Sequence, residues 1–184
     1  MTRLNKGLQV KIFLVDGIRT AEIGNWSGHA LAGPKSSRLE LSEYKETSRT
    51  GVYLLAGMDK NSAPVKVYIG ESDNIGKRLS LHANDPSKDF WDQTYLFTSK
   101  DLNLTKTHTR YLESRLMVLV SNAGCAVLVN STSPDRSVLP ITEISDMEHF
   151  LQQAQILLPL LGLDILKPTP LPHAPCSTLC QVWH

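Results

Sequence analysis

The sequence predicts an α/β protein of the α+β type, in which a small, mostly antiparallel sheet is flanked by helices. Short runs of β-forming residues occur in pairs joined by turns, as in antiparallel hairpins. Between the later runs the spacing of apolar residues changes to the helical period. The chain has 184 residues, of which 41% are hydrophobic and 20% charged. This is the size and composition of one folded core with at most a small appended lobe.

The first 48 residues are predicted to form an N-terminal β-hairpin followed by a linker. Residues 8–15 and 18–23 are rich in β-forming side chains, and the Asp16-Gly17 dipeptide between them is a strong signal for a two-residue hairpin turn. Further on, the apolar spacing in residues 36–44 indicates a short helix.

A second hairpin and a helix open the central segment, residues 49–130. Residues 51–56 and 65–70 indicate two strands joined by a polar turn. After the second strand the apolar period becomes helical, and either Asp73 or Asn74 can cap the helix that follows.

A third strand, a long helix and a fourth strand complete the central segment. Residues 95–98 alternate as a strand does, and Thr105 or Thr107 offers an N-cap for a long helix that is closed by Gly124. Residues 125–129 are typical of a short buried strand.

Residues 131–167 are predicted to form a C-terminal helical extension. Residues 145–148 fit a capping box for a last helix, which reaches Leu158 and is bent or stopped by Pro159. Residues 168–184 are rich in proline, and we expect them to be a poorly ordered tail.

Composition and charge exclude several kinds of partner. The 19 Lys and Arg residues and the 18 Asp and Glu residues give a formal net charge of +1, so any polyanion must be held by a local site. Three cysteines are too few for a disulfide framework, and the cytoplasm is the expected compartment. No apolar run approaches the ~20 residues that span a bilayer, so we expect no membrane partner.

Two tripeptides in the predicted central hairpin each carry a tyrosine, and they are Gly51-Val52-Tyr53 and Tyr68-Ile69-Gly70. Strand pairing brings the two phenols together if both point to the same face of the sheet. On the following helix, Arg78 and His82 are four residues apart and therefore lie on one stripe. On the long helix, Glu113 lies off the leucine stripe and can project toward the same cleft.

In their order and context these residues resemble the GIY-YIG nuclease family. The resemblance covers roughly residues 49–130, under half of the chain, and the ordered set carries it rather than either tripeptide alone. It implies a small antiparallel sheet with packed helices, and a metal-dependent endonuclease that hydrolyses DNA phosphodiester bonds with Mg²⁺ or Mn²⁺. The implied catalytic residues are Tyr53, Tyr68, Arg78, His82 and Glu113, with Glu113 as the metal ligand.

Each of these side chains suits phosphodiester hydrolysis. The Glu113 carboxylate is a hard oxygen ligand of the kind that Mg²⁺ prefers, and the planar Arg78 guanidinium matches phosphate oxygens and stays charged. Tyr53 is the candidate that orients or deprotonates the attacking water, with Tyr68 and His82 positioning it. A phenol, whose ordinary pKa is about 10, is a poor base unless a neighbouring cation lowers that pKa.

Other interpretations stay open. A non-catalytic module that binds nucleic acid or protein would keep the same scaffold without turnover. Glu71 follows the second tripeptide where some relatives carry lysine, and its charge would repel a phosphate unless it faces away or shares the metal. Trp26 either stacks on bases in a recognition loop or anchors the N-terminal hairpin to the core.

The charge of the central module predicts modest affinity for DNA. Residues 49–115 hold ten basic and eight acidic residues, a balance of +2. Because salt-dependent DNA affinity scales with the number of phosphates neutralised, this balance leaves room for a protein partner that targets the module. The sequence leaves the oligomeric state open.

Overall fold

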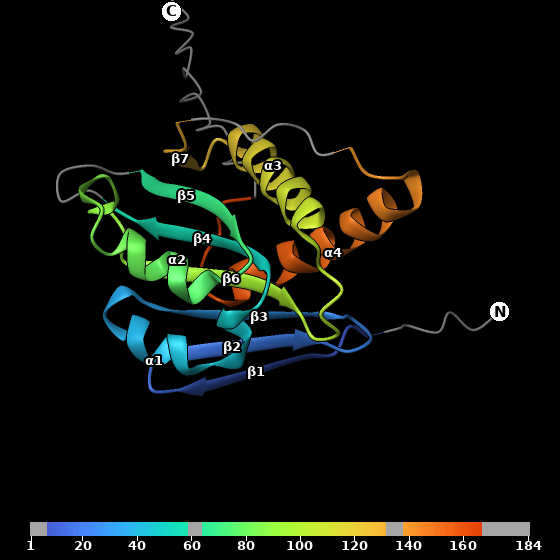
Figure 1. Cartoon of the computed structure of the whole chain (residues 1–184), viewed down its shortest axis with the longest axis horizontal. Helices are drawn as coiled ribbons and strands as arrows, with labels where there is room; N and C mark the ends of the chain where they lie inside the picture. Colours follow the sequence, from blue (N-terminus) through green and yellow to red (C-terminus); the bar gives the residue numbers. More distant parts are fainter. Residues whose placement is uncertain (1–6, 59–63, 132–137, 167–184) are drawn as a thin grey trace, which may run out of the picture.

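A seven-stranded sheet runs through the computed structural model, which describes residues 7–58, 64–131 and 138–166 (Figure 1). The strand order is β1-β2-β3-β6-β4-β5-β7, and every pairing is antiparallel except β5 with β7. The predicted α+β class with a mostly antiparallel sheet is therefore confirmed. The strands are β1 (Val10–Val15), β2 (Ile18–Ile23), β3 (Gly28–Pro34), β4 (Gly51–Gly57), β5 (Val65–Ser72), β6 (Gln93–Ser99) and β7 (Ala126–Leu128).

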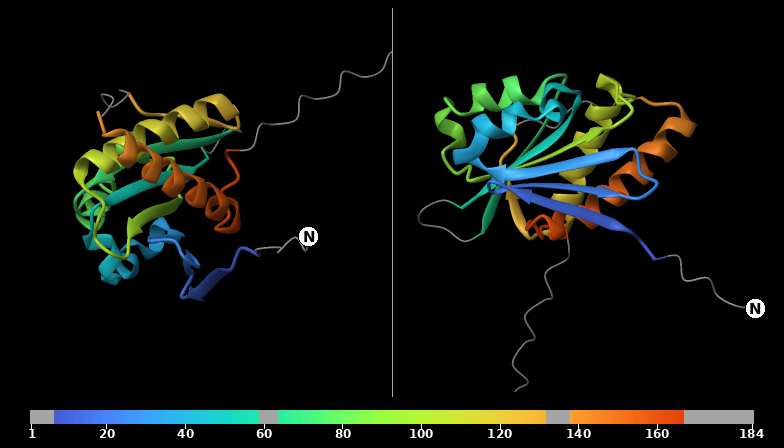
Figure 2. Two further views of the ribbon diagram at one scale, coloured as in Figure 1. Left: turned by 90° about the vertical axis from the view of Figure 1, so that its right-hand side faces the viewer. Right: turned by 90° about the horizontal axis from the view of Figure 1, so that it is seen from below.

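In the described residues, four α-helices cover the two faces of this sheet. In Figure 2, α1 and α2 lie on one face and α3 and α4 on the other, in agreement with the two apolar cores that they build against the sheet. Three short 3₁₀ helices join the elements. The helices are α1 (Arg38–Glu43), α2 (Ile75–His82), α3 (Lys106–Ala123) and α4 (Ile141–Leu160), with η1 (Lys35–Ser37), η2 (Lys45–Ser48) and η3 (Pro86–Lys88).

The N-terminal hairpin forms as predicted, but the chain continues into a third strand that the sequence did not indicate. Strand β3 pairs with β2 on one side and with β6 on the other. Its sequence of Gly, His, Ala and Leu has few β-branched residues, so β-propensity does not indicate a strand here. Gly28 shows the reason for small residues here, because a Cβ atom would stand 2.0 Å from the indole of Trp26.

Trp26 anchors the N-terminal strands to the rest of the molecule. Its side chain is 6% exposed and its ring packs on Phe150 of α4 at a centroid distance of 4.9 Å. A ring that is buried in this way cannot stack on bases without leaving the core, so the structure favours the anchoring role over a recognition loop.

Helix ends follow the predicted caps in α2 and α3 but not in α4. The Asn74 side chain accepts a hydrogen bond from the backbone at the start of α2, and Thr105 does the same for α3. Gly124 closes α3 with a φ of 65°, in the left-handed region that favours glycine. Helix α4 begins at Ile141, before the predicted capping box, and its N-cap residue is Pro140, which makes no side-chain capping hydrogen bond. Pro159 lies inside its last turn.

The edge of β5 is only partly covered by β7. The short β7 pairs with Val65, Lys66 and Val67, and beyond this point the Asn130 side chain takes the place of a strand. Its amide accepts a hydrogen bond from the Ile69 N–H at 3.0 Å and donates one to the Ile69 carbonyl at 2.7 Å. In the described ranges, the rest of β5 therefore has an open edge that side chains from both faces of the sheet can reach.

None of the helices in the described ranges has the length and apolar character that crossing a membrane requires. The tail predicted for residues 168–184 lies outside the described residues.

Candidate functional site

The two tyrosines of the predicted site lie on the same face of the sheet, beside α2. In the register of β4 and β5, Tyr53 is opposite Gly70 and Tyr68 is opposite Leu55, so the two phenols are diagonal neighbours. Their ring centroids are 6.3 Å apart. The expectation that both rings share a face therefore agrees with the geometry.

Gly70 leaves the space that the Tyr53 ring needs. A Cβ atom at Gly70 would stand 2.4 Å from the Tyr53 hydroxyl and 2.5 Å from the ring carbon that carries it. The phenol thus crosses the strand above Gly70, which places its hydroxyl toward the open edge of β5. This contact explains why the second tripeptide ends in glycine, which has no Cβ atom to collide with the Tyr53 ring.

Replacing Gly70 with alanine is expected to destabilise the fold by about 1–3 kcal/mol, because the buried Tyr53 ring must move to admit the methyl group. Urea unfolding measures this loss. Gly76→Ala is the matched control, since a Cβ atom there would meet its nearest neighbour at 3.4 Å and alanine favours a helix. A Gly70→Ala protein as stable as Gly76→Ala would show that Tyr53 does not lie over Gly70.

His82 holds the hydroxyl of Tyr53 from the end of α2. The Tyr53 Oη and His82 Nε2 atoms are 2.7 Å apart, and the His82 side chain is buried. Burial, followed by the nearby charges of Arg78 and Lys88, lowers the pKa of His82 to about 4. The imidazole is therefore neutral at physiological pH, and its Nε2 atom shares a hydrogen bond with the Tyr53 hydroxyl.

Arg78 completes this group from the exposed side of α2. Interaction with the Tyr53 hydroxyl is the main reason why its pKa is raised, and Tyr68 acts in the same direction, so the guanidinium lies near both phenols. The Tyr53 hydroxyl therefore lies between the hydrogen-bonded His82 imidazole and the charge of Arg78. Because Arg78 itself is exposed, an anion in solvent can reach it.

Tyr53 is not suited to deprotonate water. Its side chain is 0% exposed, and burial raises its pKa well above the ordinary value of a phenol. The neighbouring Arg78 opposes this shift but does not overcome it. Of the two roles expected for Tyr53, orientation of neighbouring groups is the one that its surroundings support. Tyr68 is only partly buried and is the phenol that solvent can reach.

Lys88 is a member of this site that the sequence did not reveal. It lies in the 3₁₀ helix η3, its side chain is buried, and its ammonium group is 4.1 Å from the centroid of the Tyr68 ring. Such a cation over the face of an aromatic ring is attractive and fixes the ring. The sequence does not predict this contact, because Lys88 is positioned by a short turn that has no helical or strand periodicity.

Glu113 reaches the same edge from the opposite face of the sheet, on α3. Burial, and after it the charge of Glu71, raise the pKa of Glu113 to about 7, while Arg110, Lys106 and Arg78 act in the opposite direction. Glu113 also acts electrostatically on Tyr53. Among the described residues, no hydrogen bond or ion pair holds its carboxylate. The acid and the guanidinium of the predicted set therefore lie within electrostatic range of each other.

Glu71 lies close enough to Glu113 to raise its pKa, and its own carboxylate has several partners. Its carboxylate pairs with Lys106 at 3.1 Å and accepts a hydrogen bond from the Thr109 hydroxyl at 3.3 Å. Arg110 approaches the same carboxylate at 3.9 Å. The expected repulsion of a phosphate by Glu71 is thus reduced, because two cations share its charge.

The donor chemistry at this edge fits a hard divalent cation. Glu113 offers a carboxylate oxygen as a ligand. Burial and the nearby Glu71 carboxylate make its negative charge unfavourable, and a bound cation would relieve this. In residues 7–58, 64–131 and 138–166, no group of three or more His, Cys, Asp or Glu side chains is arranged to hold a metal. A cation bound at Glu113 would take its other ligands from water and phosphate, as Mg²⁺ commonly does.

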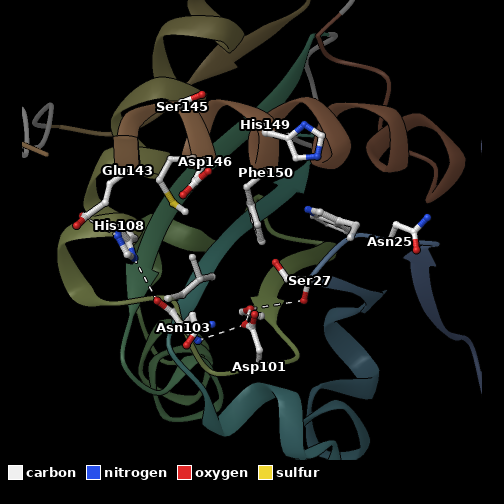
Figure 3. Close-up of a pocket in the computed structure, with 14 residues that line it drawn as sticks. Asn25, Ser27, Asp101, Asn103, His108, Glu143, Ser145, Asp146, His149 and Phe150 are labelled. Atoms are coloured by element: carbon white, nitrogen blue, oxygen red, sulfur yellow. Dashed lines mark hydrogen bonds and ion pairs between the residues drawn. The ribbon is translucent and has the colours of Figure 1, made fainter. Parts of the chain in front are cut away.

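A cavity of about 600 Å³ lies on the other face of the sheet, below α4 (Figure 3). Three carboxylates line it, those of Asp101, Glu143 and Asp146. Asp101 is engaged by Ser99 and by the Asn103 backbone, and Glu143 pairs with His108 at 3.0 Å. This negative lining disfavours a phosphate backbone, so the edge of β5 is the better candidate for binding nucleic acid.

Comparison with known proteins adds no relative to this description. No protein-family model matches the chain, and neither the curated proteins nor the solved structures contain a match.

Proposed function

We propose that the protein is a metal-dependent endonuclease of the GIY-YIG type, which hydrolyses phosphodiester bonds of DNA. The observation that carries the proposal is that Arg78 and Glu113, from separate helices, act electrostatically on each other beside the close pair of Tyr53 and Tyr68. If Arg78 and Glu113 each had only a separate structural role, there would be no reason for the two charges to lie near each other. The cysteine content favours the cytoplasm as the compartment of this activity.

In this proposal Arg78 binds the scissile phosphate. Its planar donors match the phosphate oxygens and stabilise the charge that develops on the phosphorane. Tyr53 and His82 are positioning residues, because their hydrogen-bonded pair fixes the guanidinium from the buried side. Tyr68 is placed to orient the attacking water, since its ring is held by Lys88 and is open to solvent on one side.

Glu113 is the residue that would hold the catalytic Mg²⁺ or Mn²⁺. A bound divalent cation polarises a phosphoryl oxygen and lowers the pKa of a coordinated water. The role of Glu113 itself is to present an oxygen ligand and to remain deprotonated while it does so.

The relaxation of supercoiled plasmid by the purified chain tests the proposal. Cleavage is expected with Mg²⁺ or Mn²⁺ and is expected to stop when EDTA is added. If the protein binds DNA but does not cut it with any of several divalent metals, it is a non-catalytic binding module on this scaffold. The modest charge of the central segment also favours a protein partner that targets the enzyme to its site.

Cleavage is expected to increase with pH around a midpoint close to the Glu113 pKa of about 7 and to level off at higher pH. The pKa of Glu113 is raised to about 7, so its carboxylate is mostly protonated at lower pH and cannot ligate a cation. Because the cation competes with the proton, a higher Mg²⁺ concentration is expected to move the midpoint to lower pH. Initial rates measured in a constant-ionic-strength buffer series check both effects. A midpoint that is independent of Mg²⁺ would exclude Glu113 as the titrating ligand.

A further inference from the structure

Strand β1 is an apolar edge strand that is exposed on both faces. Its large side chains Ile12, Phe13, Leu14 and Val15 are 43%, 58%, 68% and 55% exposed. It stands at one end of the strand order, where β2 pairs with only one of its edges (Figure 1). In the described part of the chain, no strand pairs with the other edge. A long apolar edge of this kind is a template for pairing with another strand.

The turn after β1 fixes which of its peptide groups point outward. Asp16 and Gly17 have φ angles of 49° and 79°, which is the geometry of a two-residue type I′ turn. In such a hairpin the residues that flank the turn exchange both hydrogen bonds, and alternate residues after them point away from the partner strand. The outward peptide groups therefore belong to Val10, Ile12 and Leu14.

These outward groups make the edge complementary to itself. An antiparallel copy of β1 with Ile12 on the two-fold axis places Val10 opposite Leu14, so one face carries a continuous apolar row. On the other face, Lys11 of each copy lies opposite Phe13, an arrangement that suits a cation beside an aromatic ring. A register with Lys11 on the axis would oppose two like charges and is disfavoured.

We propose that β1 is a homodimer interface, in which two copies join edge to edge into one continuous sheet with Ile12 on the axis. The exposed apolar side chains lie on both faces of β1, and pairing brings those of the two copies together along the shared edge. The pairing also forms about six main-chain hydrogen bonds.

The proposed dimer leaves the candidate active site open. Strands β5 and β7 lie at the opposite end of the strand order from β1, so the β5 edge is not covered. The inference does not depend on the proposed nuclease activity, because it rests on the exposure and turn geometry of the first hairpin.

Light scattering coupled to gel filtration tests the dimer. At about 100 μM the chain is expected to elute with twice its mass of 20.4 kDa. Ile12→Lys places two ammonium groups across the axis and is expected to raise the dissociation constant at least about 30-fold. Val127→Lys is the matched control, because Val127 is 44% exposed on β7 at the other edge of the sheet. This control is expected to remain dimeric.

Hydrogen exchange of the unmodified chain gives a second test that does not depend on the folding of a variant. The amides of Ile12 and Leu14 are expected to gain protection as the concentration rises, whereas those of Lys11 and Phe13, which face β2, are protected at every concentration. The proposal is overturned by a single-chain mass at about 100 μM, by an Ile12→Lys protein that dimerises as the parent does, or by amide protection at Ile12 that does not change with concentration.

Discussion

Replacing Glu113 with glutamine is expected to reduce Mg²⁺-dependent DNA cleavage at least about 1,000-fold without unfolding the protein. Glutamine keeps the size of the side chain but removes the anionic oxygen that would hold the cation. The loss corresponds to about 4 kcal/mol of transition-state stabilisation, which is within the range of metal catalysis. Quantified plasmid relaxation measures it. Cleavage retained within about tenfold would remove Glu113 from the metal site.

The same substitution is expected to stabilise the protein when no metal is bound. The folded-state pKa of Glu113 is about 7, above its ordinary value of 4.5, so between these values the folded protein binds more protons than the unfolded chain. Stability contributed by the protonated form is therefore lost as pH rises through about 7. In EDTA at about pH 8, Glu113→Gln is expected to melt at a higher temperature than the parent. His82 titrates in both proteins, and its contribution cancels in the comparison.

Glu148→Gln is the matched control for this result. The hydrogen bonds from Arg115 are the main reason why the pKa of Glu148 is lowered. The ionised form of Glu148 therefore stabilises the folded protein, which is the opposite of the effect of Glu113. Glu148→Gln is expected to lower the melting temperature slightly at neutral pH and to leave cleavage unchanged. Addition of Mg²⁺ is expected to stabilise the parent and the Glu148→Gln protein but not Glu113→Gln. Equal stabilisation of all three would show that the cation binds elsewhere.

Substitution of Arg78 with alanine is expected to reduce cleavage by about 100- to 1,000-fold, because the charge on the phosphorane loses its fixed donors. Arg78→Lys is expected to recover only part of this loss, since an ammonium group does not reproduce the two-pronged geometry of a guanidinium. Initial rates at saturating Mg²⁺ measure both effects. Lys77→Ala removes a neighbouring exposed charge from the same helix and is expected to change the rate less than about threefold.

Arg78 also interacts with the buried Tyr53 hydroxyl through its charge, so folding must be checked separately. Loss of one partner of a buried polar group costs about 1–3 kcal/mol, which urea unfolding detects. A rate loss in Lys77→Ala equal to that in Arg78→Ala would assign the effect to general positive charge and not to a specific phosphate contact.

The sequence predicted the parts of the site that depend on strand register and helical spacing. Tyr53 and Tyr68 share a face because a two-residue period fixes side-chain direction once the strands pair. Arg78 and His82 lie on one stripe of α2 for the corresponding reason in a helix. These are local rules, and they hold whatever the rest of the fold does.

The parts that the sequence did not predict depend on tertiary contacts. Lys88 lies over Tyr68 through a turn with no period, and Gly28 in β3 leaves room for the buried indole of Trp26. The burial of Tyr53, which makes it unsuited to act as a base, results from packing between α2 and the sheet. No pattern within either tripeptide carries that information.

The most direct test of the proposed site is a crystal of the protein soaked with Mn²⁺ and a short DNA duplex, examined by anomalous diffraction. We expect one manganese peak at about 2.1–2.3 Å from a Glu113 carboxylate oxygen, with a phosphate of the duplex contacting both the ion and the Arg78 guanidinium. Manganese bound away from Glu113, or a duplex whose phosphates do not reach Arg78, would contradict the proposed nuclease site.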